Sequence, residues 1–408
     1  MTAQEISAPR RQAAFIFIFI TVLLDMLALG MIIPVLPQLV LEFVDGDHAR
    51  AAEIYGIFAT VWALMQFLFS PVQGALSDRF GRRPVVLASN FGLGLDYLLM
   101  ALAPSLAWLF VGRVLSGITA ASVATANAYI ADVTPTEKRA AAFGMMGVAF
   151  GAGFILGPAL GGFLGAIDVR LPFWVAAGFS LANGIYGLII LPESLSPEKR
   201  APLAWRKANP VGSLTLLRSH RELFGLGAVS LLNSFAHAVL PTVSVLYLTF
   251  RYGWGERMIG IAMAVIGLCS VIVQGGLIKH VVGRFGERVA LVAGLMFGVA
   301  GFAMFGLAPT GAWFLAGIPV MALWGLAGAA ILALMSRRVS ASEQGRLQGA
   351  NASLMGIANM LGPPVFTVIY AGALKGEFGV TLPGAAFLLA AGCLAVALVV
   401  GVRATKGN

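Results

Sequence analysis

The chain has 408 residues, of which 59% are hydrophobic and only 11% charged, and its mean hydropathy is +0.89. Soluble domains carry roughly one quarter charged residues, so this composition excludes an ordinary soluble protein. The apolar runs are long and show no alternation of period two, which disfavours a transmembrane β-barrel.

Each crossing of a bilayer core needs about 20 apolar residues. Read between charged or turn-rich breaks, the sequence predicts twelve membrane-spanning helices, at residues 13–41, 53–74, 84–103, 106–130, 140–165, 171–191, 222–249, 257–279, 288–308, 311–334, 347–373 and 380–402. The one long polar connector covers residues 192–221 and is predicted to be a cytoplasmic linker. It separates an N-terminal six-helix bundle over 1–191 from a C-terminal six-helix bundle over 222–408.

Basic residues lie mostly on one side of the predicted helices. With the N-terminus inside, 21 of the 27 Lys and Arg residues flank the cytoplasmic ends, and five lie in the outside loops. Because such an excess sets membrane orientation, we predict that both termini are cytoplasmic, in a bacterial inner membrane. The same asymmetry accounts for the net charge of +9 without a nucleic-acid partner.

The two halves repeat at a constant offset of 205 residues. The matches keep one order and register: Phe80-Gly81 with Phe285-Gly286, Gly112 with Gly317, Gly144 with Gly349, and Gly157-Pro158 with Gly362-Pro363. Repeated halves that hold substrate near the midplane are an architecture of secondary transporters. The fold is therefore predicted to be an all-α membrane protein with twelve transmembrane helices in two pseudo-symmetric six-helix bundles.

Two acids and one strong base lie well inside predicted spans: Asp25 in the first, Asp96 in the third and Arg113 in the fourth. At about 1.5 Å rise per residue, all three fall at a similar depth. Charge is costly in hydrocarbon unless it is paired or hydrated, so we expect one compensated site with one more acid than base. We interpret this site as a proton carrier. The alternative is that the acids only bond neighbouring helices, with Arg113 holding them in place.

Other polar residues inside spans form a second group of candidates. His237 in the seventh span is able to titrate near neutral pH, and a packing role is an equally good interpretation. Six amides are candidates for lining a substrate cavity, although each one by itself also fits an interhelical hydrogen bond. These amides are Gln66, Asn127, Asn233, Gln274, Asn351 and Asn359.

The loop between the second and third spans combines a tight glycine turn with charges of both signs. Topology accounts for its arginines but not for Asp78 or the glycines, so we predict a charge clamp at a cytoplasmic gate. In the equivalent C-terminal loop Gly283 stands in place of Asp78, which makes the predicted clamp asymmetric. The predicted gate residues are Gly74, Asp78, Arg79, Gly81, Arg82 and, in the next cytoplasmic loop, Asp132 and Arg139.

The fifth span contains a regular series of small residues and one proline. Small residues let another helix approach closely, and a proline removes a backbone donor and bends its helix. A general packing face explains some of these glycines but does not require the whole register. The series is Gly144, Gly153, Gly157, Pro158, Gly161 and Gly162.

These patterns resemble the major facilitator superfamily. The Asp78 loop is similar to the signature loop of this superfamily. Arg113 with Gly117 is similar to a fourth-helix motif of its drug–proton antiporters, and the fifth-span series is similar to the antiporter motif of the same branch. Within that branch the chain resembles tetracycline-resistance efflux proteins, densely over about the first 190 residues and more weakly afterwards. The matching segments include Leu23-Leu24-Asp25, Pro34-Val-Leu-Pro37, Ala63-Leu-Met-Gln66, Ser77-Asp-Arg-Phe-Gly-Arg-Arg-Pro84, Leu95-Asp-Tyr-Leu-Leu99, Arg113-Val-Leu-Ser-Gly-Ile-Thr119 and Arg251-Tyr-Gly-Trp254.

The resemblance implies roles for particular residues. Asp25, Gln66, Asp96 and Arg113 would handle substrate and protons, and Asp78 with Arg82 would lock the gate. Tetracycline exporters also have an aspartate in the ninth span and a histidine in the eighth. Here the ninth span has no acid inside the membrane, and Ser270 stands near the expected histidine, so the C-terminal half lacks ionisable ligands for a metal-chelated drug unless His237 substitutes.

We therefore expect a proton-coupled antiporter that exports a moderately apolar organic compound or drug by alternating access. The alternatives are proton-linked uptake of a small solute, such as a sugar or metabolite, and a non-transporting membrane receptor. No enzyme activity is expected, because no nucleophile–base pair or metal constellation is visible. The expected partners are a small organic substrate, protons and membrane lipid, with no cofactor, no bound metal and a monomeric protein.

Overall fold

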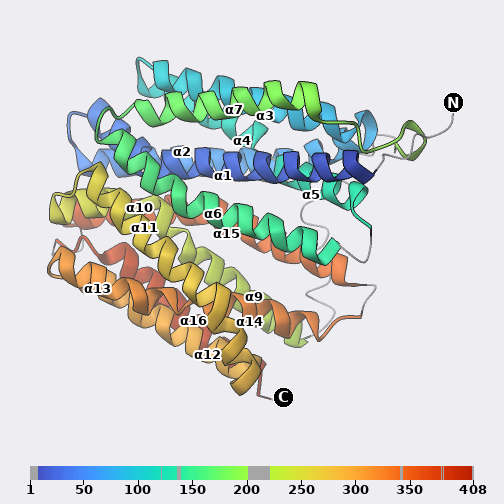
Figure 1. Cartoon of the computed structure of the whole chain (residues 1–408). Coiled ribbons are helices and arrows are strands. Elements are labelled where there is room, and N and C mark those ends of the chain that lie inside the picture. Colours follow the sequence, from blue (N-terminus) through green and yellow to red (C-terminus); the bar gives the residue numbers. More distant parts are fainter. Residues whose placement is uncertain are drawn as a thin grey trace. The chain divides into compact units, whose positions relative to one another are not determined.

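The computed structural model describes residues 8–120, 122–135, 139–200, 221–340, 343–377, 379 and 381–406. Every regular element in this part of the chain is helical (Figure 1). The helices of the first half are α1 (Ala8–Phe43), α2 (His48–Phe80), α3 (Arg82–Leu102), α4 (Leu106–Thr119), α5 (Ser122–Val133), α6 (Arg139–Gly165) and α7 (Leu171–Ile190). A short 3₁₀ turn, η2 (Pro197–Lys199), follows them.

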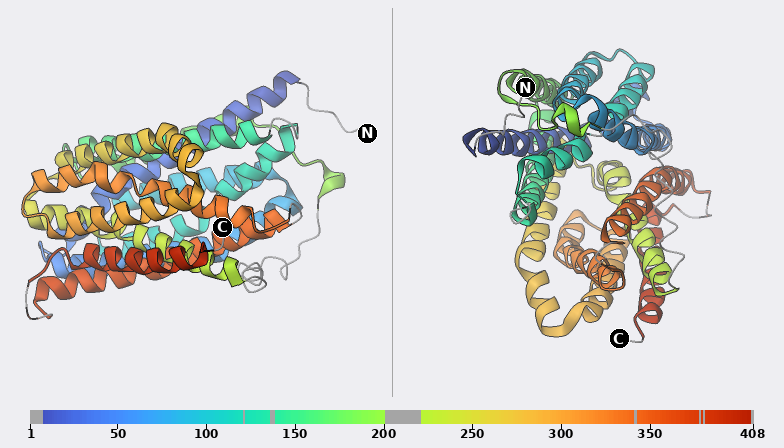
Figure 2. Two further views of the ribbon diagram at one scale, coloured as in Figure 1. Left: turned by 90° about the horizontal axis from the view of Figure 1, so that it is seen from below. Right: turned by 90° about the vertical axis from the view of Figure 1, so that its right-hand side faces the viewer.

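The second half contains more breaks within its helices. Its elements are α9 (Arg221–His237), α10 (Val239–Tyr252), α11 (Glu256–Ile272), the π-helix η5 (Val273–Leu277), α12 (Ile278–Leu307), α13 (Gly311–Ala322), α14 (Gly325–Ser336), α15 (Gln344–Lys375) and α16 (Ala385–Ala404). Figure 2 shows these helices from two further directions.

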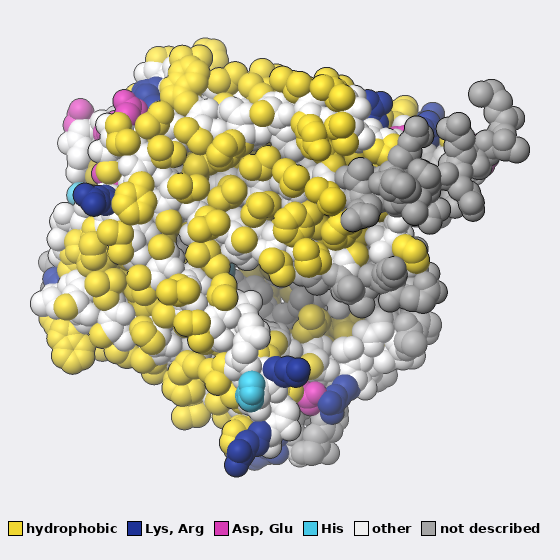
Figure 3. Space-filling model, in the orientation of Figure 1, with side chains coloured by type: hydrophobic (Ala, Val, Ile, Leu, Met, Phe, Trp, Pro, Cys, Tyr) yellow, Lys and Arg dark blue, Asp and Glu magenta, His cyan; other side chains and the backbone are white. Residues whose placement is uncertain are grey.

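The described helices make twelve membrane crossings, as the sequence predicts. Ten helical stretches are long and apolar enough to span a bilayer by length and composition. One of them, Glu256–Leu307, is interrupted by the non-helical residue Gly286 and therefore holds two spans. The twelfth span is the shorter apolar helix α4 continued by α5. Apolar side chains cover most of the face in Figure 3, and Lys and Arg gather towards the helix ends, as expected for a multi-pass membrane protein.

The chain divides into two compact units. The first unit contains α1 up to Leu39, the part of α2 from Val61 onwards, and α3 to α7. The second unit contains the segment Val40–Thr60 and the helices from α9 onwards. The segment Val40–Thr60 is attached within the second unit by an ion pair between Glu53 and Lys375 at 2.5 Å. The sequence-based boundary at 192–221 stays a prediction, and residues 201–220 lie outside the described part of the chain.

The 205-residue repeat is visible in backbone conformation and packing. Gly81 and Gly286 both have positive φ, 108° and 80°, a region that a side chain rarely adopts, and each marks the turn into the third helix of its half. Around that helix the neighbours also correspond. In the first half α3 packs against α7, α4 and α5, and in the second α12 packs against α16, α13 and α14.

The glycine series of the fifth span brings α6 into backbone contact with α1. A Cβ at Gly157 would lie 2.7 Å from Gly30 Cα, and one at Gly161 would lie 2.7 Å from Met31 Cα. Gly153 lies in the same way against Met26. Because α1 also contains Asp25, these glycines determine how closely α6 holds the helix with the buried acid.

We predict that Gly157→Ala destabilises the protein by about 1–3 kcal/mol, because α1 and α6 must separate to admit the methyl group. Gly151→Ala is a matched control on the same helix, since a Cβ there meets no heavy atom within 4 Å. Alanine also favours helix over glycine, so this control is expected to be neutral or slightly stabilising. Thermal unfolding in detergent measures both variants, and equal melting temperatures would contradict the packing role of Gly157.

Candidate functional site

The structure places the three charged residues of the first half inside its bundle, on three different helices. The exposed fraction is 5% for Asp25 on α1, 0% for Asp96 on α3 and 7% for Arg113 on α4. Tyr97 lies within electrostatic reach of all three charges, and Arg113 also acts directly on Asp96. Arg113 and Asp96 thus lie close together, and Tyr97 lies near Asp25 as well; that the three residues form one functional site stays a prediction.

Neighbouring residues shape the pocket of the Asp96 carboxyl group. A Cβ at Gly112 would lie 2.9 Å from Asp96 Oδ1, so glycine at this point of α4 makes room for the acid. The Arg113 guanidinium carbon lies 6.0 Å from the centroid of the Trp62 ring on α2, a cation–π distance. The Asp96 carboxyl group also has the Ser116 side chain of α4 as a hydrogen-bond partner. The acid is therefore buried beside one base and one hydroxyl group.

This arrangement has simple charge arithmetic. Two ionised carboxyl groups and one guanidinium sum to one net negative charge, and uptake of one proton makes the cluster neutral. A net charge in a low-dielectric interior is costly, whereas a neutral cluster is not. We name Asp25, Asp96 and Arg113 the buried charge cluster. Its geometry suits the binding and release of one proton.

The second half has the same scaffold without the charges. At an offset of 205, the positions of Asp25, Asp96 and Arg113 are occupied by Ser230, Gly301 and Ile318. A Cβ at Gly301 would lie 2.6 Å from Met321 Cα, so the space that holds Asp96 in the first half is filled by backbone in the second. Ser230 instead donates a hydrogen bond to Asn351 Oδ1 at 2.7 Å.

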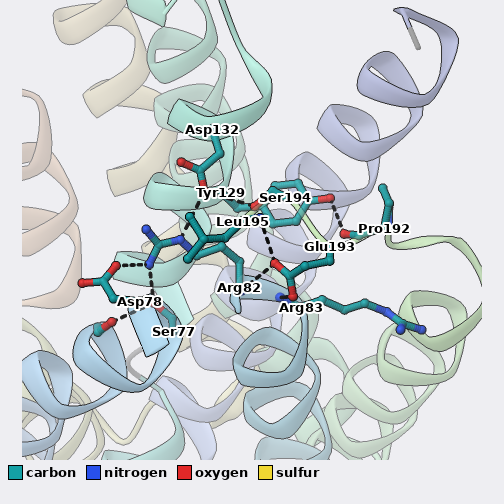
Figure 4. A network of polar contacts seen from close by, with 11 residues as sticks. Ser77, Asp78, Arg82, Arg83, Tyr129, Asp132, Pro192, Glu193, Ser194 and Leu195 are labelled. Carbon is teal, nitrogen blue, oxygen red and sulfur yellow. Dashed lines mark hydrogen bonds and ion pairs between the residues drawn. The ribbon is translucent and has the colours of Figure 1, made fainter. Parts of the chain in front are cut away.

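A second polar group gathers at the predicted cytoplasmic end of the first half, around Arg82 (Figure 4). The Arg82 side chain pairs with Asp78 at 2.5 Å and with Asp132 at 3.2 Å, and it donates to Ser77 Oγ at 2.7 Å. These partners lie on α2 and α5, while Arg82 begins α3. The predicted clamp residues Asp78, Arg82 and Asp132 are thus in direct contact.

Glu193, just beyond α7, joins this network to the chain that leaves the bundle. Its carboxylate accepts the backbone N–H of Arg82 at 2.8 Å and that of Arg83 at 3.3 Å. These are the first two N–H groups of α3, which have no partner within the helix, and a negative charge at this end also matches the helix dipole. A Cβ at Gly81 would collide with the carboxylate.

Further bonds attach the segment after α7 to α5. Ser194 Oγ donates to Asp132 Oδ2 at 3.1 Å, and the Tyr129 hydroxyl donates to the Pro192 carbonyl at 2.8 Å. We call the side chains around Arg82 and Glu193 the loop network. It ties the turn between α2 and α3, the end of α5 and the exit from α7 into one unit.

The second half repeats one ion pair of this network with the charges exchanged. Glu287 pairs with Arg337 at 2.5 Å, and these two residues correspond at the 205 offset to Arg82 and Asp132. The repeat therefore preserves a bond between the turn and the fourth helix, although the signs are reversed. The position equivalent to Glu193 is Leu398, so the helix cap has no counterpart there.

The remaining predicted residues lie in several places. Gln66 on α2 is half-buried one turn beyond Trp62, and Asn127 on α5 is exposed. Arg79 lies 5.5 Å from the Phe80 ring centroid, and a Cβ at Gly74 would meet no heavy atom within 4 Å. Asn359 on α15 is half-buried, His237 ends α9 and Gln274 lies in η5.

The side chain of Arg139 and the surroundings of Gly144 lie outside the described part of the structure. Pro158 and Gly162 lie buried on α6, as Gly153, Gly157 and Gly161 of the same series do.

Sequence reasoning missed two residues that the geometry singles out. Glu193 reads as an ordinary acid of a polar linker, and its backbone partners are 111 and 110 residues away along the chain. Trp324 reads as one more apolar residue, yet its indole N–H donates to Asn233 Oδ1 at 2.8 Å. The only local sign of the role of Glu193 is its position directly after the end of α7 and a proline.

We predict that Glu193→Ala lowers stability by about 1–2 kcal/mol, because two N–H groups at the start of α3 lose their acceptor. Glu193→Gln keeps an acceptor but no charge and is expected to lose less. Glu198→Ala, an exposed acid five residues further on, is the matched control. The measurement is the thermal unfolding of the purified variants, and a loss for Glu198→Ala as large as that for Glu193→Ala would contradict the capping role.

Comparison with known proteins supports the sequence-based resemblance. The sequence profile of the Major Facilitator Superfamily matches residues 18–363. The class C tetracycline resistance protein of Escherichia coli is 39% identical over 359 residues, which are 88% of this chain and 90% of that protein. The class G protein of Vibrio anguillarum is 37% identical over 372 residues, 90% and 93% of the two chains. Multidrug resistance protein 2 of Bacillus subtilis is 26% identical over 373 residues, 89% and 90%.

Solved structures share the fold at lower identity. The human organic anion transporter MFSD10 (TETRAN) has a TM-score of 0.69 and 24% identity, covering 96% of this chain and 99% of that one. The nucleoside transporter NupG has a TM-score of 0.76 and 13% identity, covering 97% and 100%. Together, the profile match over most of the sequence and the identity to several curated relatives show that this chain belongs to the major facilitator superfamily.

Proposed function

We propose that this chain is a proton-coupled antiporter that exports a moderately apolar organic compound by alternating access. The observation that carries the proposal is the buried charge cluster of two acids and one base in the first half. Relatives named as tetracycline and multidrug resistance proteins support a drug or drug-like compound as the cargo. The coupling ion is the proton, and no other cofactor takes part.

The cluster works as a proton carrier through its net charge. When both acids are ionised, the cluster is negative by one unit, and this favours the state in which water reaches it. Uptake of a proton from outside neutralises the cluster and favours the opposite state. Two ligands that favour opposite states of one protein are coupled by thermodynamic linkage, so proton entry drives substrate exit.

The packing of α1 transmits this change to the rest of the bundle. Asp25 and the glycine contacts with α6 lie on the same helix, within about one to two turns of each other. A shift of α1 upon protonation therefore acts on α6 through backbone contact rather than through flexible side chains. The loop network holds the other end of the bundle, where Arg82 bonds α2, α3 and α5 together.

The excess of basic residues supports an orientation with both termini in the cytoplasm of a bacterium. In this orientation the loop network faces the cytoplasm, and the protein works in the inner membrane. Proton-linked uptake of a small solute is the less favoured alternative, because the curated relatives described above are resistance proteins. Accumulation of substrate inside everted membrane vesicles, driven by an imposed proton gradient, distinguishes export from uptake.

We predict that Asp25→Asn and Asp96→Asn each reduce substrate-driven proton flux by at least about tenfold, because an amide of the same size neither binds nor releases a proton at this site. Purified protein in liposomes with an internal pH-sensitive dye provides the measurement. The test compounds include tetracycline with magnesium, uncharged antibiotics and apolar organic cations.

Asp168→Asn is the matched control, because this acid lies in the loop before α7 and its side chain accepts the backbone N–H of Arg170, a bond that an amide oxygen also accepts. It is expected to keep wild-type flux. Full proton coupling in Asp25→Asn and in Asp96→Asn would overturn the proposed role of the cluster. Binding of a compound by the wild type without any proton flux would favour a facilitator or a receptor instead.

A further inference from the structure

A pocket of about 440 Å³ lies in the second half, where the turn at Gly286 meets the end of α14. Its basic lining residues are Arg288, Arg337 and Arg338. The excess of basic residues predicts that this end of the helices faces the cytoplasm. Lys and Arg side chains also gather on the surface at this end of the second half (Figure 3). The pocket is separate from the buried charge cluster, which lies within the first half.

The lining of this pocket corresponds residue by residue to the loop network of the first half. The two glycine turns have nearly the same backbone conformation, with φ 108° and ψ 159° at Gly81 and φ 80° and ψ 167° at Gly286. The two halves therefore build the same turn, and their contents can be compared directly. The corresponding pairs at the offset of 205 are Gly81 with Gly286, Arg82 with Glu287, Arg83 with Arg288, Tyr129 with Leu334, and Asp132 with Arg337.

In the first half this place is filled by the chain itself. The segment that follows α7 bonds to the start of α3, where the Glu193 carboxylate accepts the N–H groups of Arg82 and Arg83. In the second half the equivalent helix α16 continues to Ala404, and Leu398 stands at the position of Glu193. The pocket therefore lies where the first half places a carboxylate of its own chain.

The lining of the pocket carries a net positive charge. Its three guanidinium groups and the carboxylate of Glu287 sum to two positive charges. Glu287 pairs with Arg337 at 2.5 Å, and the Arg338 guanidinium is held by a bond to the Leu334 carbonyl at 2.8 Å. The first half has Val133 at the position of Arg338, so this additional charge belongs to the second half alone. An anion with one or two negative charges is therefore the ligand that balances the lining.

The start of the helix after Gly286 adds backbone donors to the site. The first N–H groups of a helix have no partner within that helix, and the helix dipole favours an anion at this end. Here these groups belong to Glu287 and Arg288, which both line the pocket. Guanidinium groups bind phosphate oxygens through paired N–H donors. A phosphate group has oxygens on several sides, so it matches donors that come from the turn and from α14 together.

Apolar side chains at the rim indicate that this phosphate belongs to a lipid. Phe285 lines the pocket and is 58% exposed, and Val289, four residues further on, is 49% exposed. The Arg284 guanidinium carbon lies 5.8 Å from the centroid of the Phe285 ring. Apolar and basic side chains lie together in this way at a membrane surface, where basic pockets between transmembrane helices bind anionic headgroups. A free phosphate ion gains nothing from such a rim.

We propose that this pocket binds the phosphate group of an anionic membrane lipid, with Arg288, Arg338 and the helix start after Gly286 as its donors. The lipid phosphate takes the place that the Glu193 carboxylate occupies in the first half. It links the turn to the end of α14, as the loop network links the equivalent turn to α5. The proposal does not depend on the proposed function, because it concerns a lipid contact and not the cargo.

The test follows thermal unfolding of the full-length protein in a neutral detergent with increasing concentrations of dioctanoyl phosphatidylglycerol. A ligand that binds only the folded state raises the melting temperature, and the wild type is expected to show a saturable rise. Arg288→Gln and Arg338→Gln are each expected to weaken the apparent affinity about tenfold, the loss for one hydrogen bond to a charged group. Arg288→Lys keeps the charge without the paired donors and is expected to lose less.

Arg403→Gln is the matched control, because this exposed arginine lies in the last turn of α16 and outside the pocket lining. Elution as a single species and an unchanged melting temperature without lipid show that each variant is folded. Weaker binding of dioctanoyl phosphatidylcholine and of inorganic phosphate supports an anionic lipid as the ligand.

Equal affinity for phosphatidylglycerol in the wild type and in both glutamine variants would overturn the site. Binding of inorganic phosphate or of phosphatidylcholine as tight as that of phosphatidylglycerol would overturn the anionic lipid as its ligand.

Discussion

The cost of placing charge in the membrane interior is the constraint on which the rest of this structure depends. In the buried charge cluster, Gly112 makes room for Asp96, Trp62 faces the guanidinium of Arg113, and Arg113 acts on Asp96. Burial makes one net charge unfavourable and one added proton favourable. Because a buried net charge raises the free energy of the protein, the protonation state of the cluster strongly affects which conformation is stable.

The internal repeat separates what the fold needs from what the chemistry needs. Backbone features recur in both halves, including the positive φ of Gly81 and Gly286 and the close approach at Gly157 and Gly362. The ion pair between the turn and the fourth helix also recurs, with its charges exchanged. The buried charges and the Glu193 cap do not recur. Scaffold contacts are thus shared by the halves, and the groups assigned to proton handling belong to one of them.

The sequence predicts the fold well because the constraints of a membrane are local. A run of apolar residues identifies a span by itself, and basic residues mark its ends. A buried acid such as Asp96 is visible for the same reason, since it interrupts an apolar run. The glycine series on α6 is visible because small residues in lipid signal close packing, which the contacts with Gly30 and Met31 show.

Residues whose role depends on distant partners could not be found in this way. Glu193 bonds backbone N–H groups more than 100 residues away, and an acid in a polar linker is usually only a hydrated surface charge. Trp324 is one aromatic residue in an apolar span, and only tertiary packing shows that its N–H holds Asn233. Neither position interrupts a local pattern, so only tertiary structure assigns them.

The buried charge cluster is proposed to exchange its proton for substrate, and binding itself provides the most direct test. The measurement is proton release upon binding of a transported compound by purified protein in weakly buffered detergent solution, followed with a pH-sensitive dye. The wild type is expected to release protons as the compound binds. The single variants Asp25→Asn and Asp96→Asn, in which one acid and Arg113 leave the cluster neutral, are each expected to show no proton release. Binding by the wild type with no change in proton content would contradict this coupling, because the cluster and the cargo would then act independently.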